Sequence, residues 1–375
     1  MSRFKKYTCI RFTAILFSLS IISCGSKEDD IPEPETSFDK AGMLVNICDN
    51  IIIPAYTDFK ISVDSLQYHN SQFISNPSLV NLNTLQIQFI QAYKKYQKIS
   101  LYEFGPAENE LIRLNFNTFP CDTAQINSNI SSGVYDLSTA SNIDAKGLPA
   151  LDFLLYRSSQ GGDYALSLYT TSPNAVNAKN YLTALVNELK YKVDAVNNSW
   201  IGGYINTFKN NTGSDVGGSI GMLVNQLNYD LEILKNAKIG IPLGKKTLGT
   251  PLPEKAEALY STQSLTLAKE HLASIENIYL GRSKTGTDGL GLDDYVVHVN
   301  AQHPLGPLNT VIKNKFISAK DKLAVIPETL SQSVLSNANT VDAAYMELQQ
   351  LVVLLKVDMP SALGVMITYQ DNDGD

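Results

Sequence analysis

The spacing of apolar residues constrains this chain more than any other feature. Over long stretches they recur every three or four positions, which aligns them on one face of an α-helix. Such faces are buried against other helices, so the pattern predicts an all-α fold of long helices packed in bundles. The clearest sets are Leu82, Leu85, Phe89, Tyr93, Tyr96 and Leu101; Leu182, Leu185, Val186, Leu189, Val193 and Val196; Ile220, Leu223, Val224, Leu227, Leu231 and Leu234; and Val341, Tyr345, Leu348, Val352 and Leu355.

Capping residues and prolines suggest where some of these helices begin and end. The sequence Asn76-Pro77-Ser78 is a typical helix start, because a serine side chain can accept a hydrogen bond from a free backbone N–H of the first turn. Pro360 is expected to end the last helical pattern, since proline lacks the N–H that would continue it.

The amino terminus has the pattern of a secretory signal. Four basic residues precede an apolar stretch that is too short to span a membrane, and Cys24 follows it. We therefore expect a signal peptide over residues 1–23, and Cys24 resembles the cysteine of a bacterial lipobox, which carries lipids after cleavage. An ordinary cleavage site is the alternative. Residues 24–37 are polar and acidic, so they are expected to form a flexible tether, with or without a surface-export signal.

These features predict a lipid-anchored protein of the cell envelope, in the outer membrane and either periplasmic or surface-exposed. Removal of residues 1–23 takes away four of the 30 basic residues and none of the 37 acidic ones, which leaves a formal net charge of −11. Nucleic acid is therefore not an expected partner, whereas cations stay open as partners. Cys48 and Cys121 would remain, and we expect two buried free thiols.

A repeated element suggests an internal duplication. The sequence KGLPALDFLLY at residue 146 recurs as DGLGLDDYVVH at residue 288, which pairs Gly147 with Gly289 and Asp152 with Asp294. Chance similarity between helix starts is the alternative. The mature chain is also long for one hydrophobic core, so we predict a first helical bundle over residues 38–175 and a second over residues 176–375. The final DNDGD is expected to be a solvated acidic tail of the second bundle.

With this layout, the chain resembles the imelysin family of bacterial envelope proteins, also classed as imelysin peptidases, and in particular its lipoprotein branch in Bacteroidetes. Sequences that carry the resemblance include NIIIPAYTDFK, AYKKYQKISLYEFGPAE and KIGIPLGKKTLGTPLPEKAEA. The resemblance implies two four-helix-bundle-like domains with a site at their junction, and a role in iron uptake or peptide cleavage. The family motif Gly-x-His-x-x-Glu falls on Gly147, Pro149 and Asp152, so its histidine is replaced by proline and its glutamate by aspartate.

The altered motif leaves two interpretations of Asp152. It could bind iron or calcium together with other carboxylates, for which the candidates are Glu103, Glu108, Glu254 and Asp294. Alternatively, Gly147 and Pro149 form a helix entry and Asp152 complements the positive end of that helix. The sequence does not decide between them.

Independent catalytic signals are few. The zinc-peptidase sequence His-Glu-x-x-His is absent, and no Gly-x-Ser-x-Gly elbow marks a nucleophile, although a Ser-His-Asp triad stays open. His271 is expected to be an exposed helix residue. The favoured function is thus a non-catalytic binding protein that serves iron uptake by capturing a metal ion or an iron-bearing partner. A metal-dependent peptidase and a glycan- or protein-binding surface lipoprotein are the alternatives.

Overall fold

The long apolar stripes become two groups of packed helices in the computed structural model, which describes residues 37–157, 162–327 and 329–369. The predicted signal peptide, the predicted lipidation site Cys24, the predicted tether up to residue 36 and the DNDGD sequence lie outside the described residues. Residues Phe38–Asp375 form one compact unit, and its buried apolar side chains form a continuous core. The all-α prediction is confirmed.

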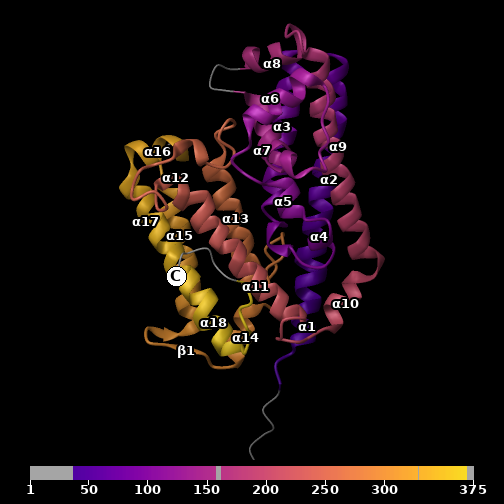
Figure 1. The fold of residues 1–375 in the computed structure, drawn as a ribbon. Helices are drawn as coiled ribbons and strands as arrows, with labels where there is room; N and C mark the ends of the chain where they lie inside the picture. The colour runs from indigo at the N-terminus through magenta and orange to yellow at the C-terminus, as the bar shows by residue number, and fades with distance from the viewer. Residues whose placement is uncertain (1–36, 158–161, 328, 370–375) are drawn as a thin grey trace, which may run out of the picture. The chain divides into compact units, whose positions relative to one another are not determined.

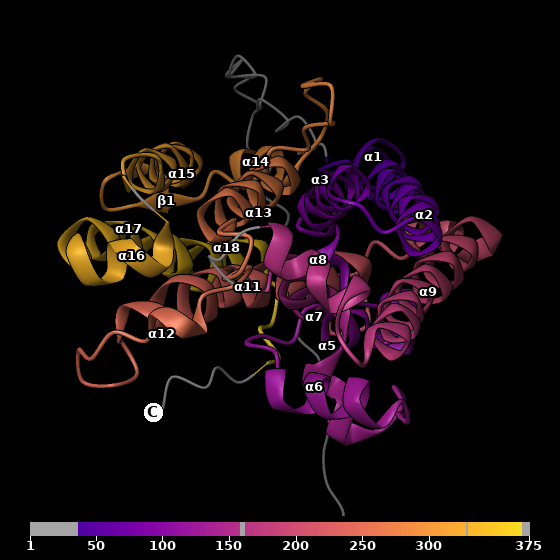
Figure 2. The same cartoon turned by 90° about the horizontal axis from the view of Figure 1, so that it is seen from above.

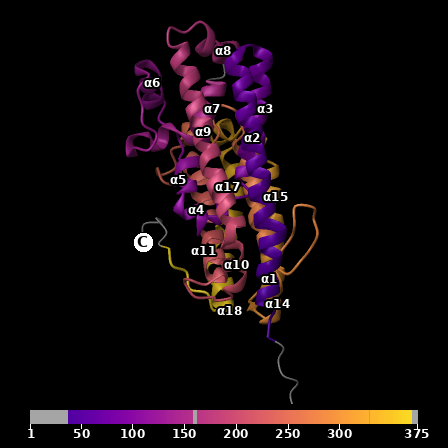
Figure 3. The same cartoon turned by 90° about the vertical axis from the view of Figure 1, so that its right-hand side faces the viewer.

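The first group contains α2, α3 and α9, whose long sides pack together, with shorter helices along them (Figures 1 and 3). The α-helices of this part of the chain are α1 (Lys40–Asn46), α2 (Ile53–Ser75), α3 (Leu79–Tyr96), α4 (Pro106–Asn109), α5 (Ile112–Phe116), α6 (Thr123–Ser132), α7 (Gly147–Tyr156), α8 (Gly162–Thr170), α9 (Ala175–Ser199) and α10 (Ile205–Asn210).

The second group contains α11, α13, α15 and α17, and Figure 2 shows it beside the first. Its α-helices are α11 (Ser219–Glu232), α12 (Ile241–Leu243), α13 (Ser264–Tyr279), α14 (Leu292–His298), α15 (Leu308–Ala324), α16 (Leu330–Ser336), α17 (Ala338–Val353) and α18 (Met359–Leu363). Two short strands, β1 (Gln302–His303) and β2 (Gly306–Pro307), form an antiparallel hairpin that pairs His303 with Gly306.

The two groups meet where the end of α3 and the following 3₁₀ turn η2 (Ser100–Tyr102) contact α11 and α13. Two further 3₁₀ turns, η3 (Ala140–Ala145) and η6 (Pro253–Lys255), precede α7 and α13 respectively. The predicted boundary at residues 175/176 falls at the start of α9, and this helix packs on α2 of the first group. The division into two bundles by duplication stays a prediction.

Within the described residues, four π-helical segments interrupt the α-helices, and three of them precede a proline. These segments are η1 (Ile47–Ile52), η4 (Trp200–Tyr204), η5 (Ile233–Gly240) and η7 (Leu354–Asp358). After η7, Met359 N donates to Leu354 O five residues earlier, and Pro360 follows. This longer spacing lets the helix continue past a residue that has no N–H. The expectation that Pro360 ends the helix was therefore wrong, because the helical backbone runs on to Leu363.

The helix start at Ser78 is confirmed, since its side chain accepts a hydrogen bond from Asn81 N at 3.3 Å. Cys48 and Cys121 are free thiols, as expected, and Cys48 is buried as expected, whereas Cys121 is only half-buried. Burial raises the pKa of each thiol to about 12, which makes both poor nucleophiles.

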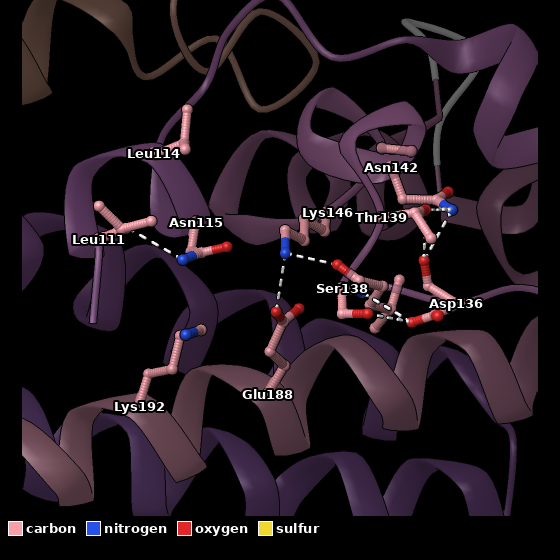
Figure 4. Close-up of polar contacts among 12 residues, drawn as sticks. Leu111, Leu114, Asn115, Asp136, Ser138, Thr139, Asn142, Lys146, Glu188 and Lys192 are labelled. Atoms are coloured by element: carbon pink, nitrogen blue, oxygen red, sulfur yellow. Dashed lines mark hydrogen bonds and ion pairs between the residues drawn. The ribbon is translucent and has the colours of Figure 1, made fainter. Parts of the chain in front are cut away.

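The entry to α7 is fixed by a buried ion pair and by a glycine. Lys146 Nζ lies 2.9 Å from Glu188 Oε1 on α9 and donates to Leu137 O at 2.6 Å (Figure 4). The next residue, Gly147, has a φ of +72°, and a Cβ placed there would lie 2.6 Å from Phe116 O. Only glycine fits this close approach of two backbones without strain.

Replacement of Gly147 by alanine should therefore destabilise the protein. We expect the Gly147→Ala change to cost at least ~2 kcal/mol of unfolding free energy, because a Cβ meets both the left-handed backbone and a carbonyl oxygen. Urea unfolding followed by far-ultraviolet circular dichroism measures this cost. Gly202→Ala is the matched control, since its φ lies outside the left-handed range and no atom lies within 4 Å of its added Cβ. Equal stability of the two variants would contradict the argument.

Candidate functional site

A cavity of about 410 Å³ lies where the two helix groups meet. Its wall combines the end of α3 and η2 with the segment around α5 on one side, and α11, η5 and α13 on the other. Polar and ionisable side chains occupy this wall between aromatic ones. The lining residues are Tyr96, Ser100, Glu103, Arg113, Leu114, Asn117, Thr118, Phe119, Tyr229, Asp230, Ile233, Ala237, Lys238 and His271.

A buried carboxylate, Asp230, is the centre of the polar wall. It accepts a hydrogen bond from Ser100 Oγ at 2.8 Å and forms a short contact with Nε2 of His271. The Arg113 guanidinium lies 3.6 Å from its other oxygen. Asp230 and His271 are both almost completely buried. Three segments of the chain therefore converge on one carboxylate, which fixes the position of each.

The ionisation of this pair follows from its neighbours. Burial raises the pKa of Asp230, but His271, Arg113 and Lys238 outweigh that effect and lower it to about 2. Burial lowers the pKa of His271 below its usual value, and Asp230 opposes this shift. An ionised carboxylate beside a neutral imidazole holds the proton on Nε2. The Nδ1 atom of His271 then carries a lone pair, and it has no partner among the described residues.

Arg113 connects this pair to a second carboxyl group. Its backbone N–H donates to both oxygens of Glu103, at 3.1 and 3.0 Å, and its guanidinium donates to Ser100 O at 3.0 Å. The guanidinium also lies 4.7 Å from the ring centre of Tyr229, a cation–π distance. Burial raises the pKa of Glu103 to about 7, although Arg113 opposes the shift.

A second buried network supports the wall from the side of η5. Lys238 Nζ lies 3.1 Å from Glu257 Oε2 and donates to Gln97 Oε1 at 2.5 Å. Asn117 donates to the other oxygen of Glu257 at 2.7 Å and accepts from Tyr93 Oη at 2.6 Å. Lys238 and Glu257 are almost completely buried, so each needs the other as a partner.

His271 was expected to be exposed, and that expectation was wrong. Its position could have been read from the sequence, because Ala268, Leu272 and Ile275 share its helix face and all are buried. The open question of a Ser-His-Asp triad is also answered at this site. Ser100 and Asp230 both contact Nε2 of the imidazole, whereas a triad uses the two ring nitrogens separately.

Asp152 lies apart from this cavity and joins the two helix groups. Its oxygens accept hydrogen bonds from the backbone N–H groups of Tyr260, at 2.9 Å, and Ser261, at 3.0 Å. The helix-entry interpretation holds for Gly147, where α7 begins, but it was wrong for Asp152, since the first turn of α7 contains no acidic residue. Burial raises the pKa of Asp152 to about 6, against the effect of the two hydrogen bonds.

The other candidate ligands are spread over the structure. Glu254 and Pro149 line a small cavity of about 20 Å³ together with Asp152, whereas Glu103 lines the large cavity and Glu108 is exposed. Asp294 accepts a hydrogen bond from Gly291 N at the start of α14. Apart from Glu254, which shares the small cavity with Asp152, the proposed metal ligands are thus not brought together. In the parts of the chain that the structure describes, no three His, Cys, Asp or Glu side chains form a group able to hold a metal ion.

Comparisons with known proteins identify the family of this chain. The family model described as imelysin, a peptidase family, matches residues 52–357. Iron-regulated protein A of Synechococcus elongatus is 20% identical over 298 residues, which covers 77% of this chain and 76% of that protein. No helix within the described ranges is long and apolar enough to cross a membrane.

Two solved structures share the fold. A putative iron-regulated protein A precursor from Parabacteroides distasonis has a TM-score of 0.72 at 17% identity, and the match covers 86% of this chain and 95% of that one. An imelysin-like protein from Psychrobacter arcticum has a TM-score of 0.68 at 18% identity, with 88% and 97% covered.

The role of Asp152 predicts a clear effect of removing its charge. In an Asp152→Asn variant the amide N–H₂ would face a backbone N–H donor, so we expect a loss of about 1–3 kcal/mol of unfolding free energy. Urea unfolding of both proteins measures the loss. Asp294→Asn is the matched control, because asparagine can still accept the bond at a helix start, and its change should stay within about 1 kcal/mol. An equal cost for both changes would contradict the assignment.

Glu103 predicts how stability changes with pH. Its folded-state pKa of about 7 exceeds the ordinary value of 4.5, so the folded protein keeps this proton over that interval while the unfolded chain loses it. The contribution of Glu103 to stability is therefore greatest below pH 4.5 and falls as the pH rises to about 7. Against Glu103→Gln, the wild type should lose stability over this window. A difference in unfolding free energy between wild type and Glu103→Gln that did not change with pH would contradict this prediction. Glu108→Gln, at an exposed position, serves as the control.

Proposed function

The chain belongs to the imelysin family, and from this premise we propose that it is a non-catalytic binding protein of iron uptake. In this proposal the cavity beside Arg113, Asp230 and His271 holds an iron-bearing ligand. The protein captures this ligand at the cell envelope and passes it on. Iron is the cargo of the protein and not a resident cofactor.

The link to iron comes from relatives. Two of the similar proteins, from Synechococcus elongatus and Parabacteroides distasonis, are described as iron-regulated protein A. Those names concern regulation of the relatives by iron. They support a role in iron metabolism for a chain that shares their fold, and the cavity supports the more specific role.

The observation that carries the proposal is the unpartnered Nδ1 of His271. Metal-binding histidines commonly donate their second N–H to a carboxylate, which fixes the ring and makes the free nitrogen a better ligand. Asp230 stands in that relation to His271, because it contacts Nε2 and is ionised. The imidazole is therefore prepared to accept either a metal ion or a hydrogen bond at Nδ1.

The surroundings of His271 favour iron that arrives already bound to a chelator. One imidazole supplies a single ligand atom, so the remaining coordination positions would be filled by the chelator. Arg113 adds a fixed positive charge to the wall, and an anionic chelate would interact favourably with it. The volume of about 410 Å³ is in the range of pockets that bind small molecules.

Two observations favour binding over peptide cleavage. By the resemblance to the family motif, Pro149 takes the place of the histidine, and proline offers no side-chain ligand atom. Ser100 shares one imidazole nitrogen with Asp230, so His271 is not placed to activate it as a nucleophile. We also propose that lipids on Cys24 anchor the protein to the outer membrane, which would keep the cavity near uptake machinery.

The proposal predicts that His271 controls the binding of an iron chelate. Residues 31–375 are titrated calorimetrically with ferric citrate, and metal-free citrate is titrated in parallel. We expect one site whose affinity depends on iron, and a loss of at least about tenfold in a His271→Gln variant, because the metal would lose its protein ligand. The exposed His298→Gln variant should bind like the wild type.

A second variant keeps the test independent of folding. Leu114 is 41% exposed at the cavity wall, so Leu114→Trp should fold and partly fill the cavity, and it should also weaken binding. The absence of any binding heat beyond that of metal-free citrate, or unchanged binding of ferric citrate by both variants, would overturn the proposal. Turnover of a mixture of labelled peptides by the wild type would instead favour the peptidase.

A further inference from the structure

A second cavity, of about 370 Å³, lies on the other side of the contact between α3 and α13. The same segments line both cavities with different residues. At the end of α3 and in the turn after it, Tyr96 lines the first cavity, whereas Lys95 and Lys98 line the second. On α13, His271 lines the first cavity and Asn277 lines the second. We refer to it as the basic cavity. Its lining residues are Ile51, Ala55, Asp58, Lys95, Lys98, Tyr102, Ser274, Asn277, Arg282, Lys284 and Thr285.

The basic cavity concentrates positive charge on an acidic protein. Four cationic side chains line it, against one carboxylate, while the whole chain has a formal net charge of −7. Lys95 and Lys284 share Asp58, at 3.1 and 2.8 Å. The ion pairs are strong enough to lower the pKa of Asp58, although burial opposes them. Asp58 thus holds two lysines in place but can balance only one of them.

The other two cations are less well balanced. Lys98 lies 3.6 Å from Glu270, a carboxylate outside the cavity lining. The guanidinium of Arg282 makes no ion pair or side-chain hydrogen bond among the described residues, although its backbone N–H donates to Asn277 O at 2.8 Å. Four cations and two carboxylates leave two positive charges without a counter-charge. Ser274, Asn277 and Thr285 add neutral polar groups to the lining.

From this arrangement we propose that the basic cavity binds a small dianion, a dicarboxylate or a phosphate. The excess of two positive charges matches such a ligand, and the planar guanidinium of Arg282 suits a carboxylate or phosphate because it can donate two parallel hydrogen bonds. The preformed Lys95–Asp58–Lys284 arrangement lowers the entropy lost on binding. This inference is independent of the proposed iron ligand, since none of its residues lines the first cavity.

The test uses inorganic phosphate and succinate as probes, titrated calorimetrically into residues 31–375 at low ionic strength. We expect saturable binding of at least one of the two probes, and the stronger one identifies the source of the dianion. Acetate, with one charge, and succinamide, with none, should bind at least about tenfold more weakly, because each lost charge pair removes a charge-assisted hydrogen bond. Affinity should fall as salt is added.

Variants locate the site. Arg282→Ala should lower the affinity about tenfold, since it removes the unpartnered cation, and Lys98→Ala should lower it in the same direction. Lys322→Ala, an exposed lysine on α15, removes the same charge outside the cavity and should change nothing. His271→Gln should also leave dianion binding intact, which separates this result from the iron proposal.

Several outcomes would overturn the inference. The inference fails if neither probe binds saturably, or if succinate and succinamide bind equally well. It also fails if the Arg282 and Lys322 variants lose the same amount of affinity for the dianion. Because Arg282 and Lys98 are only partly buried, both variants should fold, which thermal unfolding checks.

Discussion

The buried negative charge of Asp230 is the constraint on which the junction of the helix groups depends. An ionised carboxylate is costly to bury unless donors surround it, and three different segments supply them here. Ser100 comes from η2, Arg113 from α5 and His271 from α13. If any of these segments moved away, Asp230 would lose a donor in a site that water scarcely reaches. One requirement thus aligns the end of α3 with α11 and α13.

The same pairing shapes the chemistry of the cavity. Because Asp230 occupies Nε2 of His271, the other nitrogen is left as the reactive atom of the ring. Arg113 serves two purposes, since its guanidinium helps to keep Asp230 ionised and its backbone N–H fixes Glu103. The interactions that hold the helices together therefore also prepare a polar wall for a ligand.

Asp152 provides a second connection between the helix groups. Its carboxylate is occupied by two backbone N–H groups of the segment before α13. Both oxygens of Asp152 thus serve to hold the two helix groups together. The candidate ligand site is the separate, larger cavity that His271 lines.

The sequence predicted the helices well because apolar spacing is a local property that burial enforces directly. The faces of α3, α9 and α11 are buried as expected. The prediction that the helix ends at Pro360 failed because a π-helical turn, which depends on the wider packing, lets the helix continue beyond the proline. His271 was missed although it lies on a buried face. Asp230 gave no local sign of its partners, since Ser100 and Arg113 are far from it in sequence and only the tertiary fold brings them together.

The central claim is that His271 keeps Nδ1 free for a metal, and ¹⁵N magnetic resonance of imidazole-labelled protein tests it most directly. The His271 signals are assigned by their loss in the His271→Gln variant, and gallium citrate replaces ferric citrate as a diamagnetic probe. Our account predicts a neutral ring protonated at Nε2, with an Nδ1 resonance that shifts when gallium citrate is added. A ring protonated on both nitrogens, or an Nδ1 resonance unaffected by gallium, would contradict it.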